Sequence, residues 1–155
     1  AFVGLGAPHW NQEARGTILG LTRGSTDAHI ARAALESIAY QAMDVLKAME
    51  VDSGISIEEL RVDGGAAVNN LLMQFQADVL NIETVRPQII ETTAMGAAFF
   101  SGLAIGFWQN LEEIQEMWEV DRYFKPTNDT KKINNYIGGW YKALNTLEHW
   151  TKNKF

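Results

Sequence analysis

The residues best suited to chemistry lie in one stretch, from Leu60 to Asn70, which reads L-R-V-D-G-G-A-A-V-N-N. A short apolar segment ends at an acid, and Gly64 and Gly65 then turn the chain. Because glycine carries no Cβ, the backbone amides of these residues can approach a bulky ligand closely. A helix opened by the Asn69-Asn70 pair would point unpaired N–H groups and its positive dipole end at the same place. The pattern indicates either a nucleotide cradle or a tight strand-to-helix connection, and the glycines alone do not decide between them.

No other part of the chain has the spacing of catalytic machinery. The sequence lacks a phosphate-binding P-loop, a zinc-protease motif, a serine-hydrolase elbow and a dinucleotide fingerprint. The histidines His9, His29 and His149 are isolated from one another, and no acid is spaced to help His9 act as a base or ligand. We therefore expect no catalytic residue and no metal ligand, and we expect His9 to be a surface or packing residue.

The composition is that of a globular domain. Hydrophobic residues make up 46% and charged residues 21% of the 155 residues, which is enough for one domain with a buried core. No apolar run reaches the length of a membrane span. The absence of cysteine excludes disulfides and thiolate metal sites. A net charge of −6 argues against a nucleic-acid partner, so neither nucleic acid nor membrane is expected to bind.

The charge is unevenly distributed along the chain. Up to Phe124 there are 7 basic and 17 acidic residues, whereas from Lys125 onward there are 6 basic and 2 acidic residues. We interpret the basic C-terminal part as a solvated face. At the other end, Ala1-Phe2-Val3 resembles the end of a strand, which suggests that the chain is a piece of something longer.

The elements around the glycine turn alternate between helices and short strands. Helices are expected at 27–49 (with a stop at Gly54), 71–80 (capped by Asn69 and Asn70 and ended by Asn81), 92–104, 111–117 and from a cap at Thr127 or Asn128 onward. A short strand or extended run is expected at 16–21, and extended segments are expected at 60–63, 82–86 and 120–124. Ser56–Glu59 is expected to form one helical turn. This order predicts an α/β fold with parallel strands.

Apolar periodicity predicts which helix faces are buried. In the first long helix the predicted core face holds Ile30, Ala33, Ala34, Ile38, Ala42, Val45, Leu46 and Met49; in the last helix it holds Ile133, Tyr136, Ile137, Trp140, Tyr141, Leu144, Leu147 and Thr151. Trp10 is expected to anchor the glycine and proline loop before it. Gly96 costs about 1 kcal/mol relative to alanine in mid-helix, so close approach of another backbone or helix is expected there.

Several stretches, in order, resemble the FGGY family of carbohydrate kinases. Gly16-x-Ile18-x-Gly20-Leu21, followed after seven residues by His29-Ile30-x-x-Ala33-Ala34-Leu35-Glu36, is similar to the second signature of that family. Five further stretches resemble the glycerol kinase branch of the family: Phe2-x-Gly4-Leu5-Gly6-Ala7-Pro8-x-Trp10, Arg61-Val62-Asp63-Gly64-Gly65-Ala66-x-x-Asn69-Asn70-x-Leu72-Met73-Gln74, Thr93-Ala94-Met95-Gly96-Ala97-Ala98, Gly102-Leu103-Ala104-x-Gly106-Phe107-Trp108 and Arg122-x-Phe124-x-Pro126. The resemblance covers nearly the whole chain.

The resemblance implies an ATP-dependent transfer of phosphate to glycerol, giving glycerol 3-phosphate, in the cytoplasm and with Mg²⁺. Such kinases hold the nucleotide between two actin-like (ribonuclease-H-like) domains. The implied fold is therefore a partial domain of this kind, with residues 1–155 forming a single C-terminal domain that is truncated on its N-terminal side. By analogy Gly65 and Asn69 contact the nucleotide and Gly64 shapes the turn. Thr93–Ala98 matches the segment that connects the domains and helps them to hinge, which would account for Gly96.

The family's glycerol-binding residues, catalytic Asp and phosphate loops lie in segments that precede this chain. We therefore expect the chain alone to be inactive and to bind ATP or ADP weakly at best. Its expected partners are the nucleotide, the remainder of the kinase chain with its N-terminal domain, and further copies, because missing strands would leave a sheet edge open. Three alternatives remain: the same portion of another FGGY polyol or ketose kinase, a non-catalytic actin-like interaction module and, least favoured, a nucleic-acid module carried by the basic C-terminal part.

Overall fold

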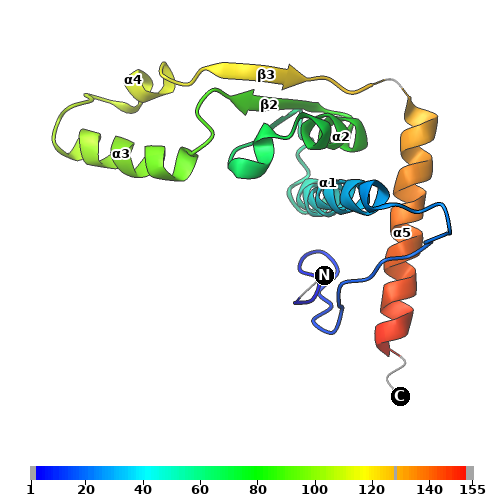
Figure 1. The fold of residues 1–155 in the computed structure, drawn as a ribbon. Helices are drawn as coiled ribbons and strands as arrows, with labels where there is room; N and C mark the ends of the chain where they lie inside the picture. Colours follow the sequence, from blue (N-terminus) through cyan, green and yellow to red (C-terminus); the bar gives the residue numbers. More distant parts are fainter. Residues whose placement is uncertain (1–2, 128, 153–155) are drawn as a thin grey trace.

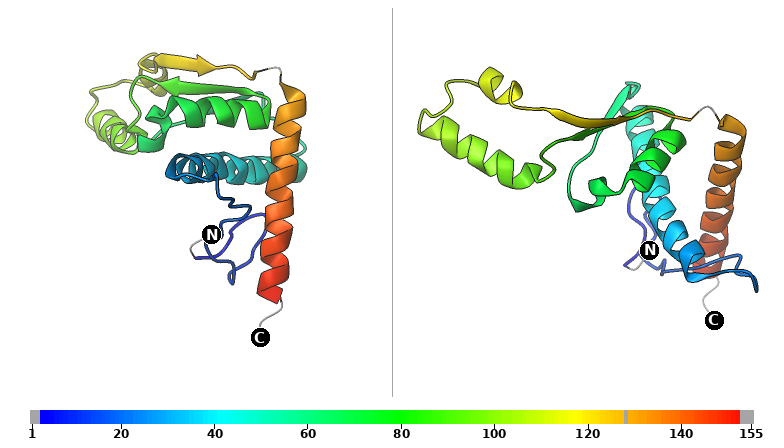
Figure 2. Two further views of the ribbon diagram at one scale, coloured as in Figure 1. Left: turned by 45° about the vertical axis from the view of Figure 1, so that its right-hand side comes forward. Right: turned by 45° about the horizontal axis from the view of Figure 1, so that its top comes forward.

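Figure 1 shows a computed structural model of the chain, which describes residues 3–127 and 129–152. A small sheet lies at one end, α2 lies against it, α1 lies beyond α2, and α5 runs beside both helices (Figures 1 and 2). The elements in chain order are α1 (Asp27–Ser53), β1 (Glu59–Arg61), a 3₁₀ helix (Gly65–Val68), α2 (Asn70–Leu80), β2 (Glu83–Pro87), α3 (Thr92–Ala104), α4 (Leu111–Gln115), β3 (Val120–Phe124) and α5 (Thr130–Lys152).

The three strands form a mixed sheet in the order β1-β2-β3. β1 and β2 are parallel, as predicted, with Glu59 opposite Glu83 and Arg61 opposite Val85. The chain between them contains the 3₁₀ helix and α2, so the glycine turn lies directly after the first strand. β3 pairs with β2 in the antiparallel direction. The predicted extended segment at 120–124 is thus the third strand of the sheet.

The core lies between α1, α2, the sheet and α5. Its buried residues are Ala39, Tyr40, Met43, Ala67, Leu72, Met73, Phe75, Ala77, Val79, Phe124 and Ile133. The ring of Tyr40 stacks on Trp140 at 5.3 Å and meets Phe75 edge-on at 5.4 Å, so one aromatic group joins three helices. Burial, and secondarily the charge of Glu36, raises the pKa of the Tyr40 hydroxyl above its ordinary value.

Helix α1 buries the face opposite to the predicted one. Tyr40 and Met43 are buried, whereas Ile30, Ile38 and Met49 of the predicted core face are exposed, Ile38 to 47%. At 100° per residue the two sets lie on opposite sides of the helix. The prediction was wrong because α1 carries apolar side chains on both sides, and periodicity does not say which side is covered. The uncovered side is an apolar surface.

Two local predictions were wrong. Trp10 is not an anchor, since it is 77% exposed. Ser56–Glu59 forms no helical turn: residues 54–58 are irregular and Glu59 opens β1. Residues 16–21, expected as a short strand or an extended run, are exposed and form no strand, because no described strand lies beside them to accept their backbone hydrogen bonds. The strand-like start at Ala1-Phe2 lies outside the described residues.

The ends of the helices around the core follow the sequence signals. Gly54 adopts the left-handed conformation after α1 and Asn81 does so after α2, as expected of helix stops. The buried face of α5 includes Ile133, Leu144 and Leu147, as predicted. The cap of α5 was wrongly assigned to Thr127, whose N–H and hydroxyl both donate to Asp78 Oδ1, at 2.7 and 2.9 Å.

At the start of α5 a different side chain acts as the cap. The side-chain carboxylate of Asp129 accepts a hydrogen bond from the backbone N–H of Lys132 at 3.4 Å, and the backbone carbonyl of Asp129 accepts one from the N–H of Ile133. Asn128, the other predicted cap, lies outside the described residues. No helix among the described residues is both long enough and apolar enough to cross a membrane.

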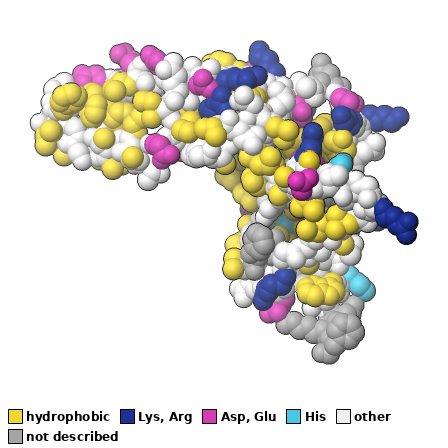
Figure 3. Space-filling model, in the orientation of Figure 1, with side chains coloured by type: hydrophobic (Ala, Val, Ile, Leu, Met, Phe, Trp, Pro, Cys, Tyr) yellow, Lys and Arg dark blue, Asp and Glu magenta, His cyan; other side chains and the backbone are white. Residues whose placement is uncertain are grey.

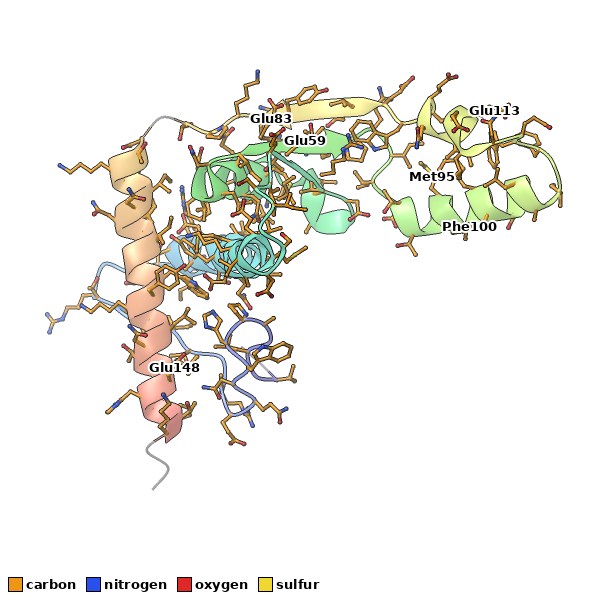
Figure 4. All side chains as sticks on the ribbon, turned by 180° about the vertical axis from the view of Figure 1, so that it is seen from behind. Glu59, Glu83, Met95, Phe100, Glu113 and Glu148 are labelled. Atoms are coloured by element: carbon orange, nitrogen blue, oxygen red, sulfur yellow. The ribbon has the colours of Figure 1, made fainter. Side chains whose placement is uncertain are left out.

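Residues 92–119, called the arm below, project from the end of the sheet (Figures 1 and 2). α3 begins and ends as predicted, and α4 is slightly shorter than predicted. Hydrophobic side chains cover much of the visible surface of the arm in Figure 3. In Figure 4, Met95 and Phe100 mark α3, and Phe100 is 76% exposed. No atom lies within 4 Å of a Cβ built on Gly96, so the close approach expected there is not found among the described residues.

Candidate functional site

The turn after β1 is held in place by the backbone of β2 and the segment that follows it. Val62 N–H donates to Val85 O at 3.0 Å, which continues the pairing of β1 with β2 beyond the strand. Gly64 N–H donates to Ile90 O at 2.8 Å. Gly64 has φ +78°, a conformation that side-chain-bearing residues rarely adopt, so glycine is required at this position. The turn is therefore a fixed structure and not a slack connection.

The outer side of the turn is open. A Cβ built on Gly64 or Gly65 would meet no heavy atom within 4 Å. The N–H groups of Gly65 and Ala66, which open the 3₁₀ helix, donate to no acceptor within the described residues. Gly65 thus offers both free space and a free backbone donor, which are the two properties that a cradle for a bulky polar ligand needs.

Asn69 caps α2, as predicted. Its Oδ1 accepts from the N–H groups of Leu71 and Leu72 at 3.0 and 3.1 Å. These amides are therefore already satisfied, which corrects the expectation that the helix would present unpaired N–H groups to a ligand. The side-chain Nδ2 of Asn69 donates to no described residue. Asn69 accordingly combines a structural acceptor with a free donor on the same amide.

The loop of residues 63–69 is also tied to the arm. The Thr92 hydroxyl donates to Asp63 Oδ2, and Thr92 is the first residue of α3. The Gly64–Ile90 hydrogen bond lies beside this contact. The start of the arm and the glycine turn therefore meet at one point. Arg86 of β2 holds the loop from another side through Ala67 O at 2.8 Å, a contact that no local sequence pattern indicated.

His9 belongs to a separate cluster. Its Nε2 is 2.9 Å from Asp44 Oδ2, and the Trp140 indole N–H donates to the same oxygen at 2.8 Å. The acid that the sequence did not place near His9 is thus Asp44, which is buried in α1. The cluster ties the N-terminal loop to α1 and α5, so His9 is a packing residue, as expected. Glu36, also on α1, pairs with Arg32 one turn earlier, at 2.6 Å.

Three cavities among the described residues lie away from the glycine turn. Two of them, of about 260 and 230 Å³, lie under the N-terminal loop, against α1 and, for the second, also against α5. A smaller one, of about 40 Å³, lies between Ile89, Met95 and Trp118 at the base of the arm. No group of three or more metal-ligating side chains converges within residues 3–127 and 129–152. The turn is accordingly an open surface and not an enclosed pocket.

Comparison with known proteins identifies the origin of this arrangement. Residues 1–105 match the FGGY family of carbohydrate kinases, C-terminal domain. Glycerol kinases of Burkholderia vietnamiensis and Paraburkholderia phymatum are each 60% identical over 150 residues, which is 97% of this chain. The chain spans only 30% of the length of these relatives.

Solved structures show the same fold. A crystal structure of Plasmodium falciparum glycerol kinase with ADP matches with a TM-score of 0.83 and 35% identity, over 95% of this chain and 29% of that one. A ligand-bound xylulose kinase from Lactobacillus acidophilus matches with a TM-score of 0.73 and 24% identity, over 92% and 29% of the two chains. The expected fold class, α/β and part of an actin-like domain, is confirmed. The chain belongs to the FGGY family of carbohydrate kinases.

Proposed function

We propose that this chain forms the nucleotide-binding part of an ATP-dependent glycerol kinase, which converts ATP and glycerol to ADP and glycerol 3-phosphate. The observation that carries the proposal is the 60% identity to glycerol kinases, which covers 150 of 155 residues and so includes the loop of residues 63–69. A similar glycerol kinase has been solved with ADP, which supports a nucleotide as the ligand. The open, fixed glycine turn supports the same assignment.

Three residues of the loop have distinct roles in this proposal. Gly64 sets the turn through its positive φ, and Gly65 lets the nucleotide lie against the backbone. Asn69 keeps α2 capped with its Oδ1 and donates to the nucleotide with its Nδ2. Because a single amide does both, the position of the donor is fixed by the helix itself.

The chain alone is proposed to be inactive. Phosphoryl transfer needs a base, a γ-phosphate cradle and Mg²⁺ in one place. Among the described residues, no group of three or more metal-ligating side chains converges to hold that metal ion. Mg²⁺ would therefore accompany ATP and be held mainly by the remainder of the kinase, which we place in the cytoplasm. Residues 1–155 are proposed to form a single C-terminal unit of that kinase.

The partner of the uncovered side of α1 is proposed to be the remainder of the kinase chain. Ile30, Ile38 and Met49 are exposed there, and Ile18 and Leu21, in the segment that precedes α1, are exposed as well. Apolar surface of this extent is normally covered by another part of a protein. As a second proposal, further copies of the protein pack on such apolar surfaces or pair with the open edge of β1 to form homo-oligomers. An N-terminal domain packed on α1 would leave that edge to be paired by further strands.

The test uses the full-length kinase that contains this chain. Purified enzyme is expected to release ADP with glycerol and far less with a pentulose such as xylulose. Two variants then address the site. Gly65→Val places a branched side chain in the open space, and Asn69→Asp keeps the helix cap but removes the free N–H donor.

Each variant is expected to raise the KM for ATP by about tenfold, Gly65→Val because its side chain clashes with the nucleotide and Asn69→Asp because one hydrogen bond is lost. The melting temperature should change little, because neither substitution removes a contact within the described chain. Arg122→Lys, on an exposed position of β3, is the matched control. A full-length enzyme that phosphorylates xylulose but not glycerol would reject the substrate assignment. Unchanged KM values for ATP in both variants would reject the site.

A further inference from the structure

Arg86 occupies a special position in the sheet. It lies in β2 opposite Arg122 of β3, at the point where the register of the two strands shifts before Pro87. Despite its charge, its side chain is only 13% exposed. A charged side chain so far from water normally has several well-placed partners. These partners lie in three elements: the 3₁₀ helix, α2 and β3.

On one side, Arg86 grips the loop of residues 63–69 and the start of α2. Its Nη1 donates to the carbonyl oxygen of Ala67 at 2.8 Å and to Asn70 Oδ1 at 3.0 Å. Ala67 lies in the 3₁₀ helix and Asn70 is the first residue of α2. The two contacts therefore flank Asn69, the residue that caps α2.

On the other side, Arg86 is held by β3. Its Nε and Nη2 are 2.7 and 2.6 Å from Asp121 Oδ2, and its guanidinium lies 5.3 Å from the centre of the buried Phe124 ring. The planar guanidinium has enough donors to reach both sides at once. A lysine ammonium is a single point of charge and cannot span the same set of partners.

We propose that Arg86, oriented by Asp121, is a positioning residue for nucleotide binding. It holds the backbone on both sides of Asn69, so that the free Nδ2 of Asn69 and the free N–H of Gly65 face the ligand before the ligand arrives. Such preorganisation improves affinity because less ordering is required on binding. The inference rests on the proposed function, since it assigns Arg86 to the same site.

The test compares three variants of the full-length kinase. R86K keeps the charge but removes the fork, D121N weakens the orienting partner, and R122K is the matched control. Arg122 lies 4.8 Å from the same Phe124 ring but makes no hydrogen bond to the loop among the described residues. R86K is expected to raise the KM for ATP about tenfold and D121N about threefold, the losses that charge-assisted hydrogen bonds predict.

The KM for glycerol, kcat and the values for R122K should stay within about twofold of wild type. A merely structural role gives a different result: kcat and melting temperature fall together while the KM for ATP is unchanged, and this would overturn the inference. If R86K does not fold, D121N decides alone. Asp121 is exposed, and the asparagine amide has the same shape as the carboxylate, so this variant is expected to fold.

Calorimetry with ATP separates the two proposals. If the wild-type enzyme binds ATP but phosphorylates no glycerol, the proposed function fails, whereas a weaker ATP Kd in R86K still supports the positioning role. If R86K and wild type then bind ATP equally, the positioning role is overturned. If the wild-type enzyme binds no ATP at all, both proposals are overturned together.

Discussion

The loop of residues 63–69 and helix α3 of the arm both contain glycine, yet their surroundings differ. The loop is held at several points, by Ile90, Thr92 and Arg86, and its outer side is open. The arm meets the rest of the described chain at its base, and its large apolar side chains, such as Phe100, are uncovered. The loop presents an open surface that is held in place, whereas the arm leaves large apolar side chains uncovered. The following experiments test that difference.

The largest expected effect comes from two phenylalanines in different surroundings. Phe75 of α2 is buried in the core against Tyr40, whereas Phe100 of α3 is exposed. Phe75→Ala should lower the free energy of unfolding of the 155-residue chain by about 3–5 kcal/mol. Phe100→Ala should change it by less than about 0.5 kcal/mol. Urea denaturation measures both, and equal losses would show that the arm is packed as tightly as the core.

A second comparison stays within α3. A Cβ on Gly102 would lie 2.1 Å from the ring of Trp108, whereas a Cβ on Gly96 would meet nothing. Gly102→Ala should therefore displace Trp108 and destabilise the arm by about 1–3 kcal/mol. Gly96→Ala should stabilise the helix by about 1 kcal/mol. Amide hydrogen exchange of residues 97–108 reports both changes, which should have opposite signs.

In the full-length kinase, Gly96→Ala is expected to be harmful, although it stabilises the isolated chain. If another part of the kinase packs against Gly96, the added methyl group of Gly96→Ala will clash there and lower activity. An unaffected full-length Gly96→Ala enzyme would indicate that no close partner covers this side of α3.

The third effect concerns the cap of α2. Asn69→Ala leaves the N–H groups of Leu71 and Leu72 without their acceptor, so the chain should lose about 1 kcal/mol of stability. Asn69→Asp retains the acceptor and should lose little. Thermal unfolding of the two variants measures the difference. Equal losses of stability in both would mean that the side-chain acceptor at position 69 does not stabilise the chain.

The smallest effect is a pH dependence of the core. Burial raises the pKa of the Tyr40 hydroxyl in the folded state. The stability that the neutral hydroxyl contributes is therefore fully present below the unfolded pKa of roughly 10, and it is lost as the pH rises above that value. Tyr40→Phe has no hydroxyl to ionise. Its melting temperature should therefore fall less steeply than that of wild type between neutral and strongly alkaline solution. Parallel curves would contradict the burial of this hydroxyl.

Local signals predicted most elements near the loop. The stops at Gly54 and Asn81, the Asn69 cap and the parallel pairing of β1 with β2 follow from short-range chemistry that the sequence displays. The covered side of α1 could not be predicted in this way, because both sides are apolar and the choice depends on what packs there. The same holds for residues 16–21, whose extended form has no described partner.

Long-range partners were the other limit. Arg86 and Ala67 are 19 residues apart, and His9 and Asp44 are 35 apart, so no local pattern joins them. The glycine turn itself was found from sequence, but the pattern did not show the open space beside Gly65, which supports the proposed cradle. Residue types thus located the candidate site, and tertiary contacts supplied its rigidity.

The most direct test of the central claim is an amide NMR titration of the isotope-labelled 155-residue chain with ADP. The amide signals of Gly65, Ala66 and Asn69, together with the side-chain Nδ2 group of Asn69, are expected to shift progressively at millimolar nucleotide, with the arm tip and the His9 cluster unchanged. Weak binding of this kind is expected because we propose that this chain supplies only part of the nucleotide site. Shifts confined to the cavities under the N-terminal loop, with none at Gly65 or Asn69, would contradict the account.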